Sequence, residues 1–241
     1  MEKLAGTRTK SMKFLERNID KIVSVSQTTT TIDGDNNNTC PNPKLKRVLV
    51  PLCGKTIDIK YLADHPGVSE VVGVDGIQTA LDEFTKEHKD LNIRAVKDSA
   101  ADRFEAFSGT KVSLLRGDFF ELDAKAAGTF DVVFDRASMV AINPTLRKEY
   151  VEVLRKVLAP GGKILLVTID RQGSDEEAVK KGPPFTIPEA TVRELYEGQD
   201  WVKSITLLSS EDSFEKDPSQ KERFDGLDRM MEHVFLIESN K

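Results

Sequence analysis

The chain has 241 residues, of which 39% are hydrophobic and 31% charged, and its formal net charge is −5. This composition is ordinary for a globular protein, and the acidic balance gives no electrostatic case for nucleic acid or an anionic membrane as a partner. With only two cysteines, Cys40 and Cys53, and no apolar run near the roughly 20 residues that span a bilayer, a disulfide framework, a Cys-rich zinc site and a membrane span are excluded, so we expect a soluble, cytoplasmic protein without a metal.

The first 43 residues differ in composition from the rest of the chain. Apolar residues recur at helical spacing between Phe14 and Val23, which predicts an amphipathic helix. Residues 24–43 are rich in Thr, Asn, Gly and Pro and can bury little apolar surface, which is typical of a flexible connector. We expect residues 1–43 to form this helix and connector, and residues 44–241 to form a single domain.

The segment that ends at Asp75 predicts two parallel strands with a ligand site at one edge. Apolar runs at Arg47–Pro51 and Glu70–Val74 indicate buried strands, and Thr56–Ala63 indicates the helix that connects them. The turn at Gly54 follows the first strand and Asp75 follows the second, so both lie at the carboxyl edge, where open α/β sheets bind ligands. Their separation is close to the roughly 20 residues at which an acid reaches a ribose hydroxyl in nucleotide-binding folds.

Strands and helices alternate through the rest of the chain. Helices are expected at Ile77–His88, from Pro144 to about Leu158, and from Pro188. Further strands are expected at Val112–Phe120, Phe130–Phe134, Lys163–Ile169, Trp201–Ser209 and His233–Glu238. Lys89–Thr110 is polar and irregular, and the last two strands are separated by a charged stretch without a clear helix. The pattern predicts an α/β, Rossmann-like class I methyltransferase fold: a mostly parallel seven-stranded sheet with an antiparallel last strand and helices on both faces.

The turn around Gly54 does not match the common phosphate-binding patterns. A Walker loop needs a second glycine five positions earlier, where Leu49 stands within a strand, and Pro51 has no N–H to offer a phosphate. The G-x-G-x-x-G pattern of dinucleotide sites is also missing, because the turn carries one glycine. An adenosine-bearing cofactor without phosphate therefore fits better.

S-adenosylmethionine is such a cofactor, and it needs close backbone approach at one turn, an acid for the ribose and an apolar slot for adenine. Gly54 and Asp75 can supply the first two. Asp118, Phe119 and Phe120 follow a strand and can supply the slot, although a Phe-Phe pair is as readily part of a core.

Four segments of the chain resemble the thiopurine S-methyltransferase family, in the family's order: VLVPLCGKTIDIKYLAD, VVGVDGI, FDVVFDRASMVAINPTLRKEY and GPPFTIP. The resemblance runs from about Arg47 to the carboxyl terminus. It implies a class I methyltransferase that moves the methyl group of S-adenosylmethionine to the sulfur of a thiopurine or another small aromatic or heterocyclic thiol. It further implies a monomer with a small-molecule thiol substrate, and neither nucleic acid nor a membrane as a partner.

The resemblance also implies which residues form the site. The cofactor-binding set that it implies is Leu52, Gly54, Asp75, Gly76, Ile77, Asp118, Phe119, Phe120 and Arg136. Arg136 is the residue expected to act on the acceptor, because a guanidinium can stabilise a thiolate or hydrogen-bond a purine nitrogen. The alternative for Arg136 is an ion pair with Asp135 or Asp118 that only shapes the site.

The amino-terminal part departs from the family pattern. Family members carry tryptophans before the first helix and a Phe-His or Trp-His pair that closes over the ligands, whereas the matching stretch here reads LAGTRTKSMKFLERNID. Two alternatives therefore remain: methylation of a halide, bisulfide or similar small anion, and a catalytically silent relative that binds the cofactor or a partner. For a thiolate acceptor, alignment with the S–CH3 bond is expected to matter more than a histidine base.

Overall fold

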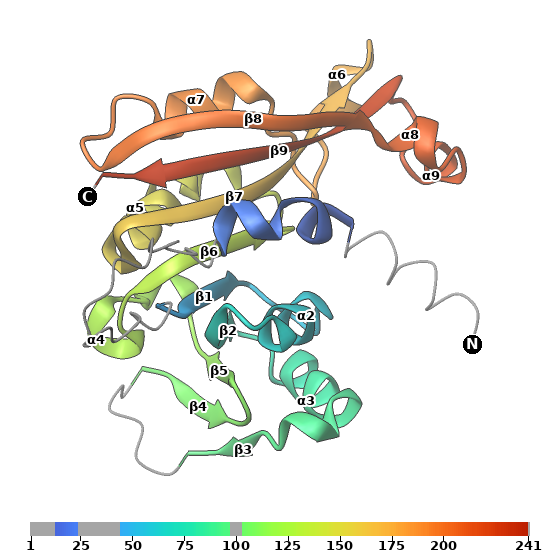
Figure 1. Cartoon of the computed structure of the whole chain (residues 1–241). Helices are drawn as coiled ribbons and strands as arrows, with labels where there is room; N and C mark the ends of the chain where they lie inside the picture. The colour runs from blue at the N-terminus through green and yellow to red at the C-terminus, as the bar shows by residue number, and fades with distance from the viewer. Residues whose placement is uncertain (1–12, 24–43, 97–102, 241) are drawn as a thin grey trace, which may run out of the picture.

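The protein folds around a nine-stranded sheet, seen in the computed structural model, which describes residues 13–23, 44–96 and 103–240 (Figure 1). The strand order is β3-β4-β5-β2-β1-β6-β7-β9-β8. The strands are β1 (Lys46–Pro51), β2 (Val68–Asp75), β3 (Arg94–Ala95), β4 (Glu105–Ser108), β5 (Val112–Arg116), β6 (Phe130–Arg136), β7 (Leu158–Gln172), β8 (Val202–Asp212) and β9 (Arg229–Ser239). The α-helices with assigned bounds are α2 (Asp58–Asp64), α3 (Gln78–Glu87), α4 (Ala124–Ala127), α5 (Arg147–Val157), α6 (Glu176–Lys180), α7 (Glu189–Tyr196), α8 (Ser213–Lys216) and α9 (Ser219–Arg223).

The five central strands β5, β2, β1, β6 and β7 are parallel, and β9 runs antiparallel between β7 and β8. The buried stretches of the parallel strands, such as residues 48–51 of β1 and 71–74 of β2, are apolar because both of their faces are covered. One face packs against helix 13–22, α2 and α3, and the other against α5 and α7. The expected mostly parallel sheet with helices on both faces and an antiparallel strand at its end is confirmed.

The sheet has nine strands where seven were expected, because β3 and β4 form an antiparallel extension beside β5. Both lie in the stretch Lys89–Thr110, which the sequence predicted to be irregular. The extension is at the sheet edge, and its side chains are exposed or half-buried. Such strands need no alternating apolar pattern, since backbone ladders hold them, β4 to β5 and β3 to β4.

Two further polar stretches contain short helices that the sequence did not predict. α6 lies in the loop after β7, and α8 and α9 lie in the charged stretch between β8 and β9. These helices have five residues or fewer. Helices of this length have no hydrophobic period to read, and a side-chain cap at Asp175 or Asp212 provides a local start.

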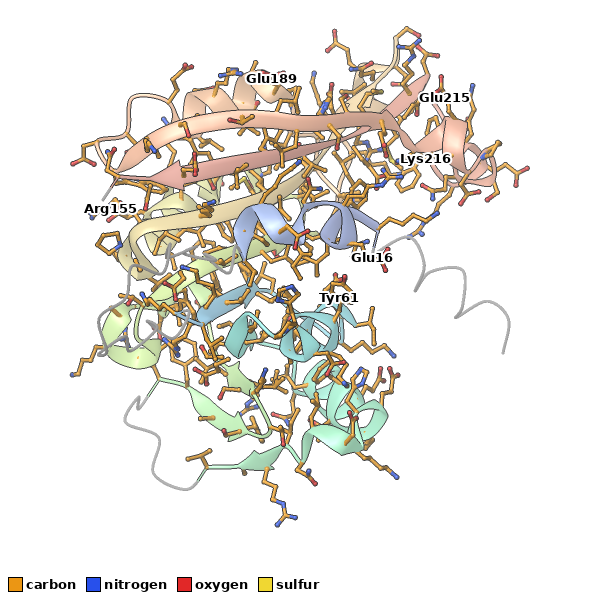
Figure 2. All side chains as sticks on the ribbon, viewed as in Figure 1. Glu16, Tyr61, Arg155, Glu189, Glu215 and Lys216 are labelled. Carbon is orange, nitrogen blue, oxygen red and sulfur yellow. The ribbon has the colours of Figure 1, made fainter. Side chains whose placement is uncertain are left out.

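The amino-terminal helix is confirmed at residues 13–22, and its apolar side packs on the sheet. Its polar side reaches the far end of the chain: Arg17 forms an ion pair with Glu211 of β8 at 2.8 Å. Lys216 of α8, labelled in Figure 2, stands over the Phe14 ring with its Nζ 5.4 Å from the ring centroid. The connector expected at residues 24–43 lies outside the described residues. Within the described ranges, no helix is long and apolar enough to cross a membrane.

Gly73 of β2 allows the first turn to pack against the sheet. A Cβ at this position would lie 2.8 Å from Cys53 Sγ and 3.0 Å from Ile59 Cδ1. Gly73→Ala is therefore expected to lower the free energy of unfolding by about 1–3 kcal/mol, measured by urea denaturation, because the added methyl overfills the core.

Gly76→Ala is the matched control, because its Cβ would meet its nearest atom at an ordinary 3.6 Å. Adding Cys53→Ala to the Gly73 variant removes the clashing sulfur and should recover part of the loss. Equal stability of the two single glycine variants would contradict the packing argument.

Candidate active site

The turn after β1 brings the backbone to the sheet edge in an unusual conformation. Leu52 has φ +40° and Gly54 has φ +51°, a region that glycine adopts freely and leucine rarely. The turn is fixed to β2, because the Cys53 N–H donates to the Val74 carbonyl at 3.0 Å. Burial raises the pKa of the Cys53 thiol well above its usual range, so this cysteine is not a ready nucleophile.

Asp75, the last residue of β2, holds this turn in place through both of its carboxylate oxygens. Oδ2 accepts the Gly54 N–H at 2.7 Å, and Oδ1 accepts the Ile77 N–H at 2.8 Å. The side chain thereby links the carboxyl ends of β1 and β2. A carboxylate has about four acceptor positions, so two remain for hydroxyl donors of a ligand.

A cavity of about 670 Å³ lies at this edge, over the ends of β1, β2 and β5. Five of the residues predicted for the cofactor site line it: Leu52, Gly76, Asp118, Phe119 and Phe120. Three other predicted residues do not line it: Gly54 lies in the turn after β1, Asp75 ends β2, and Ile77, two residues further along, is 60% exposed.

The two phenylalanines have different environments. Phe119 is buried and stacks on Tyr150 of α5, with ring centroids 4.9 Å apart, so it belongs to the core as well as to the cavity wall. Phe120 is half-buried and meets Phe119 edge to face. The Asp118 carboxylate accepts the Phe120 N–H at 2.9 Å and fixes the turn between them.

The far wall of this cavity was missed by sequence reasoning. It consists of Arg103, Phe104, Glu105, Arg116 and Gly117. The wall packs closely at Gly117, where a Cβ would come within 2.5 Å of the Phe104 ring and 2.8 Å of the Arg103 carbonyl oxygen. Gly117, directly before Asp118, was a sequence signal for close packing at this point. The segment that packs against it could not be identified, because β4 was not predicted.

A second cavity of about 980 Å³ lies over the ends of β6 and β7 and the start of β9. Its polar lining residues are Arg136, Asp217, Ser219, Gln220, Arg223 and Glu232. Its other lining residues are Ala137, Val140, Ala141, Ile169, Pro183, Pro184, Phe224 and Met230. The cavity therefore combines apolar surface for a ring with charged groups of both signs.

The Pro183–Pro184 wall is anchored by backbone and guanidinium contacts. The Phe185 N–H donates to the Val140 carbonyl at 2.7 Å. Buried Arg171 donates to the Pro184 carbonyl at 3.0 Å, and Arg147 donates to the Thr186 carbonyl at 3.0 Å. The GPPF segment is thus a fixed wall of the second cavity.

Arg136, the last residue of β6, lines the second cavity and is paired with Asp58 of α2. Its Nη1 lies 3.6 Å from Asp58 Oδ2, and the Thr56 hydroxyl donates to the same oxygen at 2.8 Å. Asp58 is 1% exposed, so the pair is anchored at a buried carboxylate. The expected alternative partners, Asp135 and Asp118, were wrong: Asp118 caps the Phe120 turn, and Asp135 faces the core.

Asp135 is fully buried behind Arg136 and organises the loop that follows β6. Its carboxylate accepts the Tyr150 hydroxyl at 2.8 Å and the Met139 N–H at 3.2 Å. Burial raises the pKa of Asp135 to about 6, although these hydrogen bonds favour the charged form. These contacts give Asp135 a structural role.

Two cavities side by side along the carboxyl edge of an open, mostly parallel sheet, one at a glycine turn with an acid on the next strand, define a class I methyltransferase architecture. Ser138, in the loop after β6, donates to the Pro51 carbonyl and ties the second cavity to the turn of the first. Solved structures agree with this fold. The phosphoethanolamine N-methyltransferase 2 of Haemonchus contortus in complex with S-adenosyl-L-methionine matches 82% of this chain and 49% of its own, with a TM-score of 0.57 at 17% identity.

The family follows from the sequence comparisons. The profile described as Thiopurine S-methyltransferase matches residues 36–240. The thiopurine S-methyltransferase of Vibrio atlanticus is 37% identical over 194 residues, covering 80% of this chain and 81% of that protein. The probable thiopurine S-methyltransferase of Danio rerio is 32% identical over 192 residues, covering 79% and 77%. The chain therefore belongs to the thiopurine S-methyltransferase family, and it is an S-adenosyl-L-methionine-dependent methyltransferase.

The fold by itself does not define the reaction, which is why the family match matters. The [4+2]-cyclase SpnF matches 81% of this chain and 76% of its own at a TM-score of 0.55 and 12% identity. A protein described as a cyclase thus shares the architecture about as closely as a methyltransferase does. The fold therefore does not identify the methyl acceptor.

The buried Asp135 carboxylate predicts a specific pH dependence of stability. Because its pKa is raised when folded, this group favours the folded state most below about pH 4, and that contribution is lost as pH rises through about 6. The loss is on the order of 3 kcal/mol. Asp135→Asn abolishes the titration, so the unfolding free energy of the variant relative to wild type should rise between pH 4 and pH 7.

Urea denaturation at several pH values measures this difference. Asp200→Asn, at an exposed aspartate, is the control and should track the wild type. A variant-minus-wild-type difference that stays flat from pH 4 to pH 7 would contradict the raised pKa.

Proposed function

We propose that the chain methylates the sulfur of small aromatic or heterocyclic thiols, including thiopurines. The observation that carries the proposal is the second cavity, which joins apolar walls to the Arg136 guanidinium at the carboxyl edge of β6. The relatives of similar sequence are named thiopurine S-methyltransferases, which supports the same acceptor class. A cavity of about 980 Å³ is much larger than a halide or bisulfide needs, and this favours an organic acceptor over those anions.

The first cavity suits the cofactor. Its volume of about 670 Å³ is within the range of small-molecule sites, and Asp75 keeps acceptor capacity beside the glycine turn. In the proposed site, Leu52 and Gly54 give close backbone approach, and Asp75 binds the ribose hydroxyls. Gly76, Ile77, Asp118, Phe119 and Phe120 would hold the adenosine portion.

When bound, S-adenosylmethionine supplies an electrophilic methyl group on a sulfonium. The protein's part is to hold the acceptor sulfur in line with that group, and holding two reactants in register can supply up to roughly 7–11 kcal/mol of the barrier. Arg136 would stabilise the thiolate form of the acceptor, and Asp58 would keep the guanidinium in position. Asp58 acts through Arg136 and is therefore a positioning residue in this proposal.

An acceptor panel tests the proposal. Methyl transfer to 6-mercaptopurine, benzenethiol, bisulfide and iodide would be measured with the full chain, using labelled S-adenosylmethionine. Turnover is expected with the two organic thiols. Turnover with bisulfide or iodide alone would favour the small-anion alternative, and cofactor binding without any turnover would favour a silent relative.

Asp75→Ala is expected to weaken S-adenosylmethionine binding on the order of 10- to 100-fold, measured by calorimetry. The change removes the charged acceptor proposed for the ribose and releases the Gly54 and Ile77 amides that shape the turn. Asp82→Ala, at an exposed position of α3, is the control and should bind as wild type. Unchanged cofactor affinity in a folded Asp75 variant would remove this residue from the site.

Arg136→Ala is expected to lower kcat/KM for a thiol on the order of 10- to 100-fold while the cofactor Kd changes by no more than about threefold. Arg136→Lys should recover part of the activity, since lysine keeps the charge but lacks the planar fork. Asp58→Asn should give an intermediate loss, because the guanidinium loses its buried partner. Parallel losses of cofactor affinity and turnover in the Arg136→Ala variant would contradict an acceptor-side role.

A further inference from the structure

Among the described charged residues that line the second cavity, Glu232 of β9 is the one with a buried side-chain oxygen that has no hydrogen-bond partner. Its Oε2 is inaccessible, whereas the residue as a whole is half-buried and lines the cavity, so Oε1 is the carboxylate oxygen that a ligand can reach. No ion pair is formed by Glu232 within residues 13–23, 44–96 and 103–240. A carboxylate in such a place costs free energy unless a donor satisfies it.

The cations around Glu232 have other partners. Arg17 and Lys216 both pair with Glu211. Arg136 pairs with Asp58, and the Arg223 guanidinium lies 5.5 Å from the centroid of the Phe224 ring. The charge of Glu232 is therefore not neutralised by the cations of its own cavity.

Glu211 adds a second cost. It lies directly opposite Glu232 in the β8–β9 ladder, and like charges facing each other across an antiparallel pair destabilise it. Arg17 and Lys216 offset the charge of Glu211. Glu232 has no such partner among the described residues, so its charge is both partly removed from water and repelled by that of Glu211. An N–H of a ligand in the cavity that donates to Oε1 would stabilise the carboxylate charge.

We propose that Glu232 is the specificity-determining residue that accepts a hydrogen bond from an N–H of the methyl acceptor, so that the site favours heterocyclic thiols with an N–H near the sulfur over benzenethiols. This inference rests on the proposed function and names the acceptor chemistry of the same cavity. In this arrangement the apolar wall of Val140, Ile169 and Met230 packs against the ring of the acceptor. Arg136 interacts with the sulfur of the acceptor, and Glu232 accepts its N–H. An analogue without the donor leaves the carboxylate unsatisfied, and a polar site penalises such an analogue strongly.

The test compares 6-mercaptopurine, which carries ring N–H groups, with benzenethiol, which has none. Glu232→Gln should lower kcat/KM for 6-mercaptopurine on the order of 10-fold, because the acceptor of the hydrogen bond loses its charge, and change that for benzenethiol by no more than about twofold. Calorimetry of 6-mercaptopurine in the presence of S-adenosylhomocysteine should show the same loss of affinity without turnover. Glu238→Gln is the matched control on the same strand, where Glu238 pairs with Lys163 away from the cavity.

Thermal unfolding separates this role from a structural one. Glu232→Gln removes an unpaired charge opposite Glu211, so its Tm should equal or exceed that of wild type. A lower Tm together with equal losses for both thiols would overturn the inference, as would an unchanged 6-mercaptopurine to benzenethiol ratio. Failure of the wild-type chain to methylate either thiol would overturn the proposed function, whereas wild-type turnover with an unchanged ratio in the variant overturns this inference alone.

Discussion

One carboxylate determines the shape of the sheet's carboxyl edge at β1 and β2. Asp75 accepts the Gly54 amide from the turn after β1 and the Ile77 amide from the start of α3. The turn needs this support, because it holds Leu52 at a positive φ that a leucine adopts only at a cost of order 1–3 kcal/mol. Gly73 and the buried Cys53 complete the fit beneath it. The acid proposed to bind ribose therefore also builds the turn that the adenosine would approach.

The β6 end of the second cavity depends on one compensated pair of charges and on the buried carboxylate beside it. Asp58 holds Arg136 at the end of β6, while Asp135, one residue earlier, points the other way and anchors the following loop through Tyr150 and Met139. Adjacent residues of one strand thus serve the cavity and the core. This division follows from the alternation of side chains along a strand, and it gives the Asp-Arg pair two distinct tasks.

Much of the fold and half of the site could be predicted from the sequence, and the boundary has a physical cause. The buried strands β1, β2, β6 and β7 carry continuous apolar runs, and Asp75 and Arg136 end two of these strands. The sheet edge at which both residues lie could therefore be predicted from the sequence. β3 and β4 are held by backbone pairing at an exposed edge and leave no apolar signal, so the wall formed by Arg103 and Phe104 was missed. Asp58 was missed as the partner of Arg136 because it lies within a helix 78 positions away in the sequence, where only the tertiary structure brings it to the site.

The wall of α8 and α9 has a consequence for how such enzymes diverge. The two helices lie in the connection between β8 and β9, beyond the end of the ladder at Asp212 and Met231. They contribute Ser219, Gln220 and Arg223 to the second cavity but no lining residue to the first. Changes in the length or residues of this connection would reshape the cavity proposed for the acceptor while the cavity proposed for the methyl donor stayed intact. Descendants of one ancestral enzyme can in this way acquire new acceptors without having to rebuild the use of a common donor.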